Sequence, residues 1–279
     1  MATIDPNPPG TTQPEHNAAD LRDRLEEAEA QLGLVTGERD ALLKEMDDLA
    51  RFLSHDLRAP LRGIDGYSTA LMEDYGSKLD PLGIAYLEYI AEGGRQAAYL
   101  IDRLIYFIRV RHAEIQIQTI DLSQLASDLI NDPIKGLNKS QQDRKISWLI
   151  APGLLIEGDF RMIRELMSIL LENAWKFTGK HAAALVEVGQ IQIDGQAVFF
   201  VGDDGAGFNM DYLEQLFLPF HRLHNGHDFE GAGMGLAIAH RIIQRHGGRI
   251  WGEGKVDQGA TFYFTLEGEG IKKGEFYDR

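Results

Sequence analysis

A histidine with an acidic neighbour offers the clearest nucleophile in this sequence. His55 and Asp56 stand in the run Ser-His-Asp-Leu-Arg-Ala-Pro-Leu, one residue off the apolar seam of a predicted helix. The imidazole of His55 should therefore face solvent, where it is a competent nucleophile if one ring nitrogen is free and the other is held. Asp56 can accept the Nδ1 proton and stabilise the imidazolium that develops during attack on a γ-phosphate. An isolated pair of this kind is more often an ordinary surface histidine, so the interpretation depends on other motifs.

A second patch, Asp203-Asp204-Gly205-Ala206-Gly207-Phe208, follows the strand-like run from Val198 to Val201. The two glycines, Gly205 and Gly207, allow the backbone to approach a ligand closely. A carboxylate at the end of a strand, here Asp203, can accept a hydrogen bond from an exocyclic amine such as that of adenine. Taken alone, such a loop is usually only a turn.

A third patch, Gly231-Ala232-Gly233-Met234-Gly235-Leu236, opens the apolar helical stretch from Ala237 to Arg245. Backbone N–H groups at the start of such a helix can bind phosphate. The spacing of the glycines is not that of the dinucleotide-binding fingerprint, and the chain contains no phosphate-binding loop of the G-x-x-x-x-G-K-[ST] type.

Asn173 and Lys176 form the fourth patch, three residues apart near the end of a predicted helix. Both side chains can therefore point toward one site. An amide oxygen suits Mg²⁺ and an ammonium group suits a phosphate. The alternative is a solvated helix end with no ligand.

The helix that carries His55 begins far upstream. Apolar residues recur at alternating steps of four and three from Leu21 to Leu53, which is typical of a coiled coil and most simply of a parallel dimer. We assign residues 17–50 to this coil and residues 1–16, which contain four prolines, to a disordered lead-in. The alternative is a single helix lying on a globular domain, but charged residues leave it only a narrow apolar stripe.

A helical hairpin should follow the coil. No turn signal separates the coil from His55, and Pro60 should bend the helix because proline removes one helical hydrogen bond. A second helical pattern spans about Pro81 to His112, and the segment from Asp74 to Asp80 reads as the turn. Two such hairpins from two chains would form a four-helix bundle, since one hairpin alone cannot cover its apolar faces.

The sequence after Ile115 alternates strand-like and helical segments. The helix predicted from Phe160 to Phe177 is apolar on one face, which indicates a sheet with helices packed on one side. The strand-like runs are Ile115–Ile120, Ile146–Ala151, Gln190–Ile193, Ala197–Val201, Arg249–Gly252 and Thr261–Leu266.

Composition excludes several classes of protein. The formal net charge of −15 over 279 residues disfavours a nucleic-acid-binding protein, and the absence of cysteine excludes disulfides and cysteine-ligated zinc. The nine histidines lack ligand spacing. The sequence has no apolar run long enough to span a bilayer and no secretory signal pattern, so we expect a cytoplasmic chain.

Together and in this order, the four motifs resemble the transmitter region of two-component sensor histidine kinases. The resemblance covers about Ala50 to Leu266. It implies an α+β fold, in which a coiled coil and a dimeric four-helix bundle of helical hairpins precede an α/β sandwich ATP-binding domain of the histidine kinase, gyrase and Hsp90 type. The corresponding domains are residues 51–116 for dimerisation and histidine phosphotransfer and residues 117–268 for ATP binding, followed by a tail at 269–279.

The resemblance also implies roles for individual residues. His55 would be the phospho-acceptor and Asp56 the acidic general base. Asn173 would ligate Mg²⁺, Lys176 would face the phosphates of ATP, and Asp203 would read adenine. The remaining residues implied to contact the nucleotide lie beside this aspartate or in the lid over ATP: Gly205, Gly207, Phe217, Phe220, Arg222, Gly231, Gly233, Gly235 and Leu236.

Three positions depart from the family pattern. Ile169 stands where many members have a second asparagine, so metal coordination depends more on Asn173 and water. Asp204 replaces the usual asparagine after the adenine-reading aspartate, a change that we expect to be tolerated. Ala59 replaces the Thr or Asn that orients a hydrolytic water, which places phosphatase activity in doubt.

The leading hypothesis is ATP-dependent autophosphorylation of His55, followed by transfer of the phosphoryl group to an aspartate of a response regulator. The expected partners are a second copy of the chain, that regulator, and an upstream sensor module or protein. One alternative is an ATPase of the same fold that forms no phosphohistidine. The other is a degenerate kinase that acts as a nucleotide-binding signalling scaffold.

Overall fold

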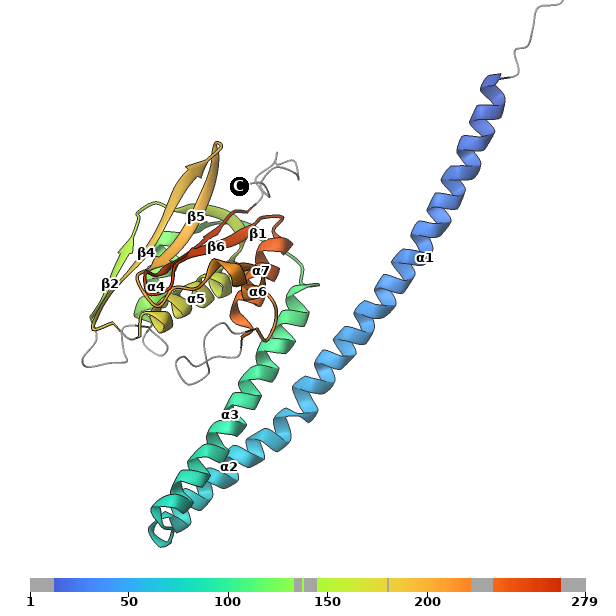
Figure 1. Cartoon of the computed structure of the whole chain (residues 1–279). Coiled ribbons are helices and arrows are strands. Elements are labelled where there is room, and N and C mark those ends of the chain that lie inside the picture. Colours follow the sequence, from blue (N-terminus) through green and yellow to red (C-terminus); the bar gives the residue numbers. More distant parts are fainter. Residues whose placement is uncertain (1–12, 133–136, 138–144, 180, 222–232, 267–279) are drawn as a thin grey trace, which may run out of the picture. The chain divides into compact units, whose positions relative to one another are not determined.

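The computed structural model describes residues 13–132, 137, 145–179, 181–221 and 233–266. It divides into two compact units, Met1–Arg51 and Phe52–Arg279. Figure 1 labels the helices and strands. None of the described helices has the length and apolar character that a membrane span requires.

The first helix, α1, runs from Gln13 to Asp56. Residues 13–16, which we predicted to belong to a disordered lead-in, are therefore helical, and that boundary is corrected. Pro14 lies in its first turn, where the N–H that proline lacks would have no helical partner. Several apolar residues of the predicted seam are about half exposed or more in the single chain: Leu25, Leu32, Val35, Leu42 and Leu49.

Helix α1 ends at Asp56, and α2 (Arg58–Tyr75) begins after Leu57. The interruption has a local cause, because Pro60 has no N–H to bond the carbonyl of Asp56. The bend that we predicted at Pro60 is thus a break three residues earlier. The Arg58 guanidinium donates to Asp102 Oδ1 from Nε at 2.9 Å and from Nη2 at 2.5 Å, which links the first residue of α2 to α3 (Pro81–Val110).

Helices α2 and α3 (Pro81–Val110) form the predicted hairpin, joined by the short 3₁₀ helix η1 (Gly76–Lys78). The start of α3 is capped by Asp80, whose Oδ1 accepts from the Gly83 N–H at 2.7 Å. The helices approach closely at Gly94, where a Cβ atom would lie 3.2 Å from Ile64 Cγ2.

In the described part of residues 117–266, the strands form two sheets. The larger has the order β2-β4-β5-β7-β6, and only its β2–β4 pair is parallel. The smaller pairs β1 with β3 in antiparallel register. The bounds of the strands are β1 Ile117–Asp121, β2 Lys145–Ile150, β3 Leu155–Asp159, β4 Ala183–Ile193, β5 Gln196–Asp203, β6 Ile250–Gly254 and β7 Ala260–Phe264.

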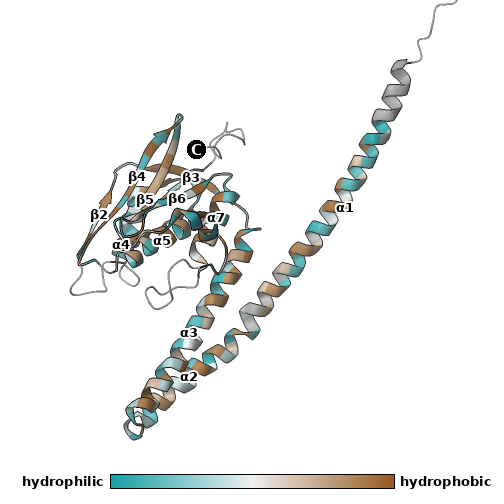
Figure 2. Ribbon diagram, viewed as in Figure 1, coloured by the Kyte–Doolittle hydropathy of each residue, from teal (hydrophilic) through white to brown (hydrophobic). Residues whose placement is uncertain are grey.

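One face of the larger sheet is covered by α4 (Leu122–Asn131), α5 (Phe160–Phe177) and α7 (Gly235–Arg245) (Figure 1). Between α6 (Leu213–Leu216), which follows the 3₁₀ helix η2 (Met210–Tyr212), and α7 lies the undescribed segment 222–232. The helices are amphipathic, with brown and teal segments along each ribbon in Figure 2. Their fully buried side chains include Leu166, Leu170, Ile238 and Ile242. The predicted sheet with helices on one side is confirmed.

Candidate functional site

Helix α5 brings the predicted nucleotide motifs together. Ile169, Asn173 and Phe177 are separated by four residues each and therefore lie along one ridge of the helix. At one end of this ridge, a Cβ atom added to Gly235 would lie 3.3 Å from Ile169 Cγ2. At the other end, the carbonyl of Phe177 accepts the N–H of Ala206 at 3.0 Å. Asn173 is thus flanked by the glycine motif of α7 and by the loop after β5.

Lys176 lies in the last turn of α5, one turn after Asn173. Its Nζ atom is 4.4 Å from the centre of the Phe177 ring, within the range of a cation–π contact. Both Asn173 and Lys176 are half-buried, so each has part of its side chain accessible to a ligand.

Asp203 is the last residue of β5, as the sequence indicates. Its Oδ1 accepts from the Gly205 N–H at 2.9 Å. Burial raises the pKa of the Asp203 carboxyl to about 6, while hydrogen bonds from the backbone of Gly205 and Ala260 act in the opposite direction. The carboxylate is therefore ionised at neutral pH and remains a hydrogen-bond acceptor.

Nucleotide affinity should depend on the charge of Asp203. If the ionised carboxylate accepts the adenine amine, ADP affinity should rise about tenfold between pH 5 and pH 7.5, because protonation below a pKa of about 6 removes the acceptor. Calorimetric titration at several pH values measures this change. Asp203→Asn is the matched control, since the phosphates of ADP titrate equally in both proteins. An equal pH dependence in the variant would contradict the role of Asp203.

Close backbone contacts leave no room for a side chain at Gly205 or Gly207. A Cβ atom at Gly205 would overlap the carbonyl of Phe177. Gly207 has φ 60°, and a Cβ atom there would overlap the carbonyl oxygen of Lys255. The loop after β5 is therefore pressed against both α5 and the β6–β7 turn, and only glycine fits.

Gly207→Ala should destabilise the domain by about 2 kcal/mol or more, since it combines backbone strain with overlap. Gly153→Ala is the control, because Gly153 has φ 72° and open space around its Cα. Chemical denaturation of the two variants separates the cost of backbone strain, which both share, from the cost of overlap, which only Gly207→Ala has. Equal losses of unfolding free energy would show that the contact with Lys255 is unimportant.

The third glycine motif leads into the start of α7. Gly235 and Leu236 are its first two residues, and the helix has no side-chain cap at Met234. The N–H of Phe220 donates to the Gly233 carbonyl at 2.9 Å, and both residues have positive φ. This bond joins the two ends of the predicted lid. Arg222 and Gly231 lie outside the described residues.

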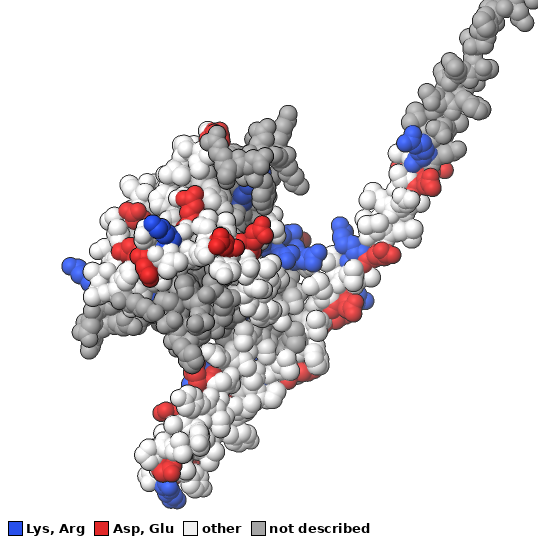
Figure 3. Space-filling model, viewed as in Figure 1, with Lys and Arg blue, Asp and Glu red and all other residues white. Residues whose placement is uncertain are grey.

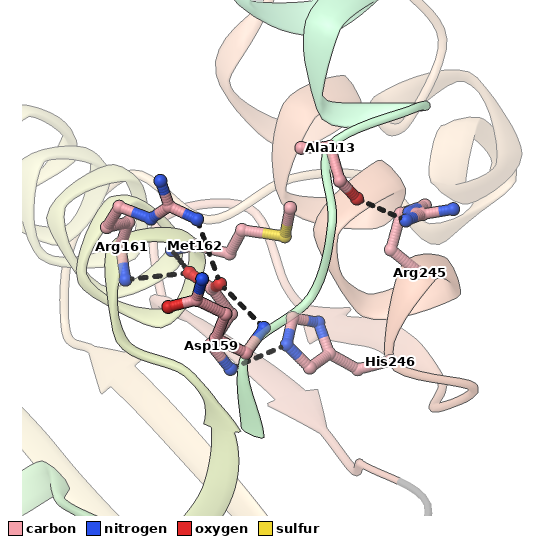
Figure 4. A network of polar contacts seen from close by, with 7 residues as sticks. Ala113, Asp159, Arg161, Met162, Arg245 and His246 are labelled. Carbon is pink, nitrogen blue, oxygen red and sulfur yellow. Dashed lines mark hydrogen bonds and ion pairs between the residues drawn. The ribbon is translucent and has the colours of Figure 1, made fainter. Parts of the chain in front are cut away.

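A buried polar network supports the first turn of α5 (Figure 4). Asp159 caps this helix, and its carboxylate accepts from the N–H groups of Gln116, Arg161 and Met162 at 3.1, 3.0 and 3.2 Å. Burial opposes its ionisation, but these bonds and the Arg161 guanidinium lower its pKa. The Asp159 N–H donates to His246 Nε2 at 3.0 Å, which ties α5 to the end of α7.

The residues that we predict to form the phospho-acceptor site lie on the other predicted domain. His55 is the penultimate residue of α1 and Asp56 its last, next to the break before α2. Among the described residues, two side chains of α3 and the backbone just after this helix contact α5 and α7. Arg103 forms an ion pair with Glu165, the Arg241 guanidinium lies 4.7 Å from the centre of the Phe107 ring, and Arg245 Nη2 donates to the Ala113 carbonyl at 2.6 Å.

The structure shows what two of the residues that depart from the family pattern contact. Ile169 is buried in the core beside Gly235, and Asp204 Oδ1 accepts from the Leu185 N–H at 3.0 Å. The sequence analysis did not find the Asp159–His246 bond, which joins residues 87 positions apart. Only the N-cap preference of an aspartate just before Phe160 could have signalled one half of it.

Two family models match the chain in the order of the domains. Residues 45–113 match the His Kinase A (phospho-acceptor) domain, and residues 158–270 match the histidine kinase-, DNA gyrase B-, and HSP90-like ATPase. The chain belongs to the sensor histidine kinases. Its transmitter region therefore has the α+β fold that the motifs predict.

Similar histidine kinases and phytochromes support this assignment. Cyanobacterial phytochrome B of Nostoc sp. is 33% identical over 255 residues, which cover 87% of this chain and 33% of that protein. The methanogenesis regulatory histidine kinase FilI of Methanothrix harundinacea is 32% identical, covering 87% and 27%. The adaptive-response sensory kinase SasA of Thermosynechococcus vestitus is 31% identical, covering 82% and 62%.

A solved structure shares the fold. Full-length ShkA in complex with AMPPNP has a TM-score of 0.56 and 27% identity, and the match covers 78% of this chain and 45% of that chain. The sensor histidine kinase chain spans about a third of the length of the cyanobacterial phytochromes that it matches.

Proposed function

We propose that the chain is an ATP-dependent protein histidine kinase core that phosphorylates His55 and passes the phosphoryl group to an aspartate of a response regulator. The observation that carries this proposal is the arrangement on α5, which places Asn173 between the Asp203 loop and the glycine motif of α7. His55 lies in α1, within residues 45–113 that match the phospho-acceptor domain, and precedes this site in the same chain.

ATP would be recognised at both ends of this arrangement. Asp203 accepts the adenine amine, and Gly205 and Gly207 keep the surrounding backbone close to the base. Lys176 and the N–H groups in the first turn of α7, which have no partner within that helix, face the phosphates. Phe217, Phe220 and Leu236, with Arg222, Gly231 and Gly233, complete the lid side of the site.

Mg²⁺ would be held by Asn173 together with the phosphates of ATP and water. Among the described residues, no group of three or more His, Cys, Asp or Glu side chains is placed to hold a metal ion. Mg²⁺ commonly binds through few protein ligands plus substrate phosphates, so one amide oxygen is a suitable protein contribution. The ion, when bound, neutralises charge that develops on the phosphates.

The phosphoryl step itself needs few protein groups. The Nε2 lone pair of His55 attacks the γ-phosphorus, the bond from phosphorus to the bridging oxygen breaks, and ADP leaves with that electron pair. Asp56 holds the Nδ1 proton and offsets the positive charge on the ring. Catalysis depends mainly on positioning and charge neutralisation, as is general for phosphoryl transfer.

A homodimer would complete the phospho-acceptor domain. Many apolar residues of the α2–α3 hairpin are more than 40% exposed in the single chain: Ile64, Leu71, Tyr75, Leu82, Tyr86, Tyr89 and Ile90. A second hairpin would bury them in a four-helix bundle, and the exposed seam of α1 would continue the dimer as a coiled coil. The proposed domains are the coil that ends at residue 50, first predicted as 17–50, then residues 51–116, residues 117–268 and a tail at 269–279.

The other proposed partners are a response regulator receiver domain and an upstream sensor module or protein that acts through α1. We propose that this region works in the cytoplasm, where ATP and response regulators occur together. Nucleic acid is not among the proposed ligands. Acidic and basic side chains are interspersed on the face shown in Figure 3, whereas nucleic-acid binding requires a basic surface.

Labelling of the purified chain with γ-labelled ATP and Mg²⁺ tests the proposal. A histidine kinase should acquire label that survives alkali and is lost in acid, because a phosphoramidate is acid-labile. Phosphate release without any labelled protein would instead favour an ATPase of this fold. ATP binding with neither label nor phosphate release would favour a degenerate kinase that acts as a scaffold.

A further inference from the structure

The open face of the five-stranded sheet carries a row of aromatic rings. Phe200, Tyr263 and Trp251 are paired across β5, β7 and β6. Ring centres are 6.1 Å apart between Phe200 and Tyr263 and 5.4 Å apart between Trp251 and Tyr263. Their neighbours Phe199 and Phe264 enter the core under the helices, so these three rings point to the opposite face.

The aromatic row extends over a fourth strand. Gly189 of β4 pairs with Phe200, and a Cβ atom there would lie 2.5 Å from Cζ of the Phe200 ring. The ring therefore lies over the bare backbone of β4. All three aromatic side chains are only partly buried, and the described helices α4, α5 and α7 pack on the other face.

Two carboxylates lie beside the aromatic row. Glu187 pairs with Gly202, which pairs with Thr261, and Thr261 pairs with Glu253. These residues form the next level of side chains on the same face, two residues from the aromatic row on each strand. Glu187 and Glu253 are exposed. Burial and then the charge of Glu253 raise the pKa of the Tyr263 hydroxyl, which places this carboxylate close to the row.

The chain leaves the sheet next to this surface. Thr265 follows Tyr263 by two residues and is adjacent to the aromatic row, and the described chain ends at Leu266. Residues 267–279 contain three large apolar side chains, four acidic residues, Arg279 and the pair Lys272-Lys273, which concentrates two of the three basic charges at one place. Thr261, which is level with the two glutamates, is four residues before Thr265, a distance of about 13 Å at about 3.3 Å per residue. The seven residues from Thr265 to Lys272 reach about 23 Å when extended, so the lysines can reach the glutamates.

We propose that the open face of the sheet is a docking surface for residues 267–279 of the same chain. The apolar side chains Ile271, Phe276 and Tyr277 pack on the aromatic row, and Lys272 and Lys273 lie beside Glu187 and Glu253. Because the segment is tethered at Leu266, its effective concentration at this face is high, and weak individual contacts are sufficient to hold it. This inference does not depend on the proposed kinase activity.

Quenching of Trp251 fluorescence by acrylamide tests the docking. In the full chain, Trp148→Phe and Trp175→Phe leave Trp251 as the single tryptophan of the three. Reversing both charges with Lys272→Glu and Lys273→Glu should raise the quenching constant about twofold, because reversed charges repel the tail from the glutamates. Adding Glu187→Lys and Glu253→Lys to this protein should restore the original value. Lys78→Glu, at the tip of the hairpin, is the control and should change nothing.

Deletion of residues 267–279 provides the second measurement, and it should raise the quenching constant at least as much as the charge reversal. A quenching constant that is unchanged by both the reversal and the deletion would overturn the proposal. A constant that falls with protein concentration and is insensitive to the deletion would also overturn it, in favour of a second copy of the chain on this face.

Discussion

His55→Gln should abolish labelling from γ-labelled ATP while leaving nucleotide affinity within about twofold of the original. The expected loss is complete, because no other residue replaces the nucleophile and the phosphoryl group then has no acceptor. Glutamine is polar, and the position is close to the end of α1, so the substitution should preserve the hairpin. Autoradiography for label and calorimetry for ADP binding measure the two effects separately.

The matched control is Asp56→Asn, which retains the nucleophile and removes the carboxylate that holds its proton. Labelling should fall by about 10² to 10⁴, the usual range for a general acid–base group, without disappearing. Persistent acid-labile label in His55→Gln would show that another residue is the acceptor. Full labelling in Asp56→Asn would remove Asp56 from the mechanism.

Asn173→Ala should lower the rate of labelling by on the order of 10²-fold, because it removes the one proposed protein ligand of Mg²⁺ and leaves phosphate charge poorly neutralised. The side chain lies on the α5 ridge between Ile169 and Phe177, whose contacts with Gly235 and Ala206 do not involve it. The fold should therefore survive the substitution. Initial rates measured over a range of Mg²⁺ concentrations should show that the variant requires more metal.

Glu172→Gln is a suitable control for Asn173→Ala. Glu172 is the preceding residue on α5, is exposed, and accepts a hydrogen bond from Ser168 at 2.7 Å. Its loss should change the labelling rate less than about twofold, as is common for surface substitutions. An unchanged Mg²⁺ dependence in Asn173→Ala would contradict its role as the metal ligand.

The elements that carry local signals were predicted closely. The predicted bounds of α5, Phe160 and Phe177, are those of the structure, because an apolar face of period 3.6 fills the helix from end to end. The hairpin turn and α3 are also confirmed, helped by Asp80 and Pro81 at the helix start. The family assignment rests on the order of four short motifs, and the comparisons confirm it.

Features that depend on distant partners were not predictable in this way. Strand β3 (Leu155–Asp159) was missed, since it is short, contains Gly158 and, among the described strands, pairs with β1 alone. The helix start at Gln13 was missed because the four prolines of residues 1–16 indicated disorder, although proline fits the first helical turn. Nothing local to His246 indicates that it accepts a bond from Asp159 across the domain.

In the candidate site, too, local sequence signals located residues, whereas contacts with distant segments could not be predicted. The positions of Asp203, Gly205 and Gly207 followed from residue types after a strand, whereas the reason for Gly207, contact with the Lys255 carbonyl, required the fold. The raised pKa of Asp203 also follows from burial by segments remote in sequence. Motifs thus locate the site, and packing explains why its residues cannot be exchanged.

Mass-spectrometric mapping of the phosphorylated residue at neutral pH tests the central claim most directly. After incubation with ATP and Mg²⁺, the peptide that contains Ser54, His55 and Asp56 should gain the mass of one phosphoryl group, and fragmentation should place it on His55. The same peptide from a reaction without Mg²⁺ should be unmodified. A phosphoryl group on any other residue, or ATP turnover with this peptide unmodified, would contradict the account.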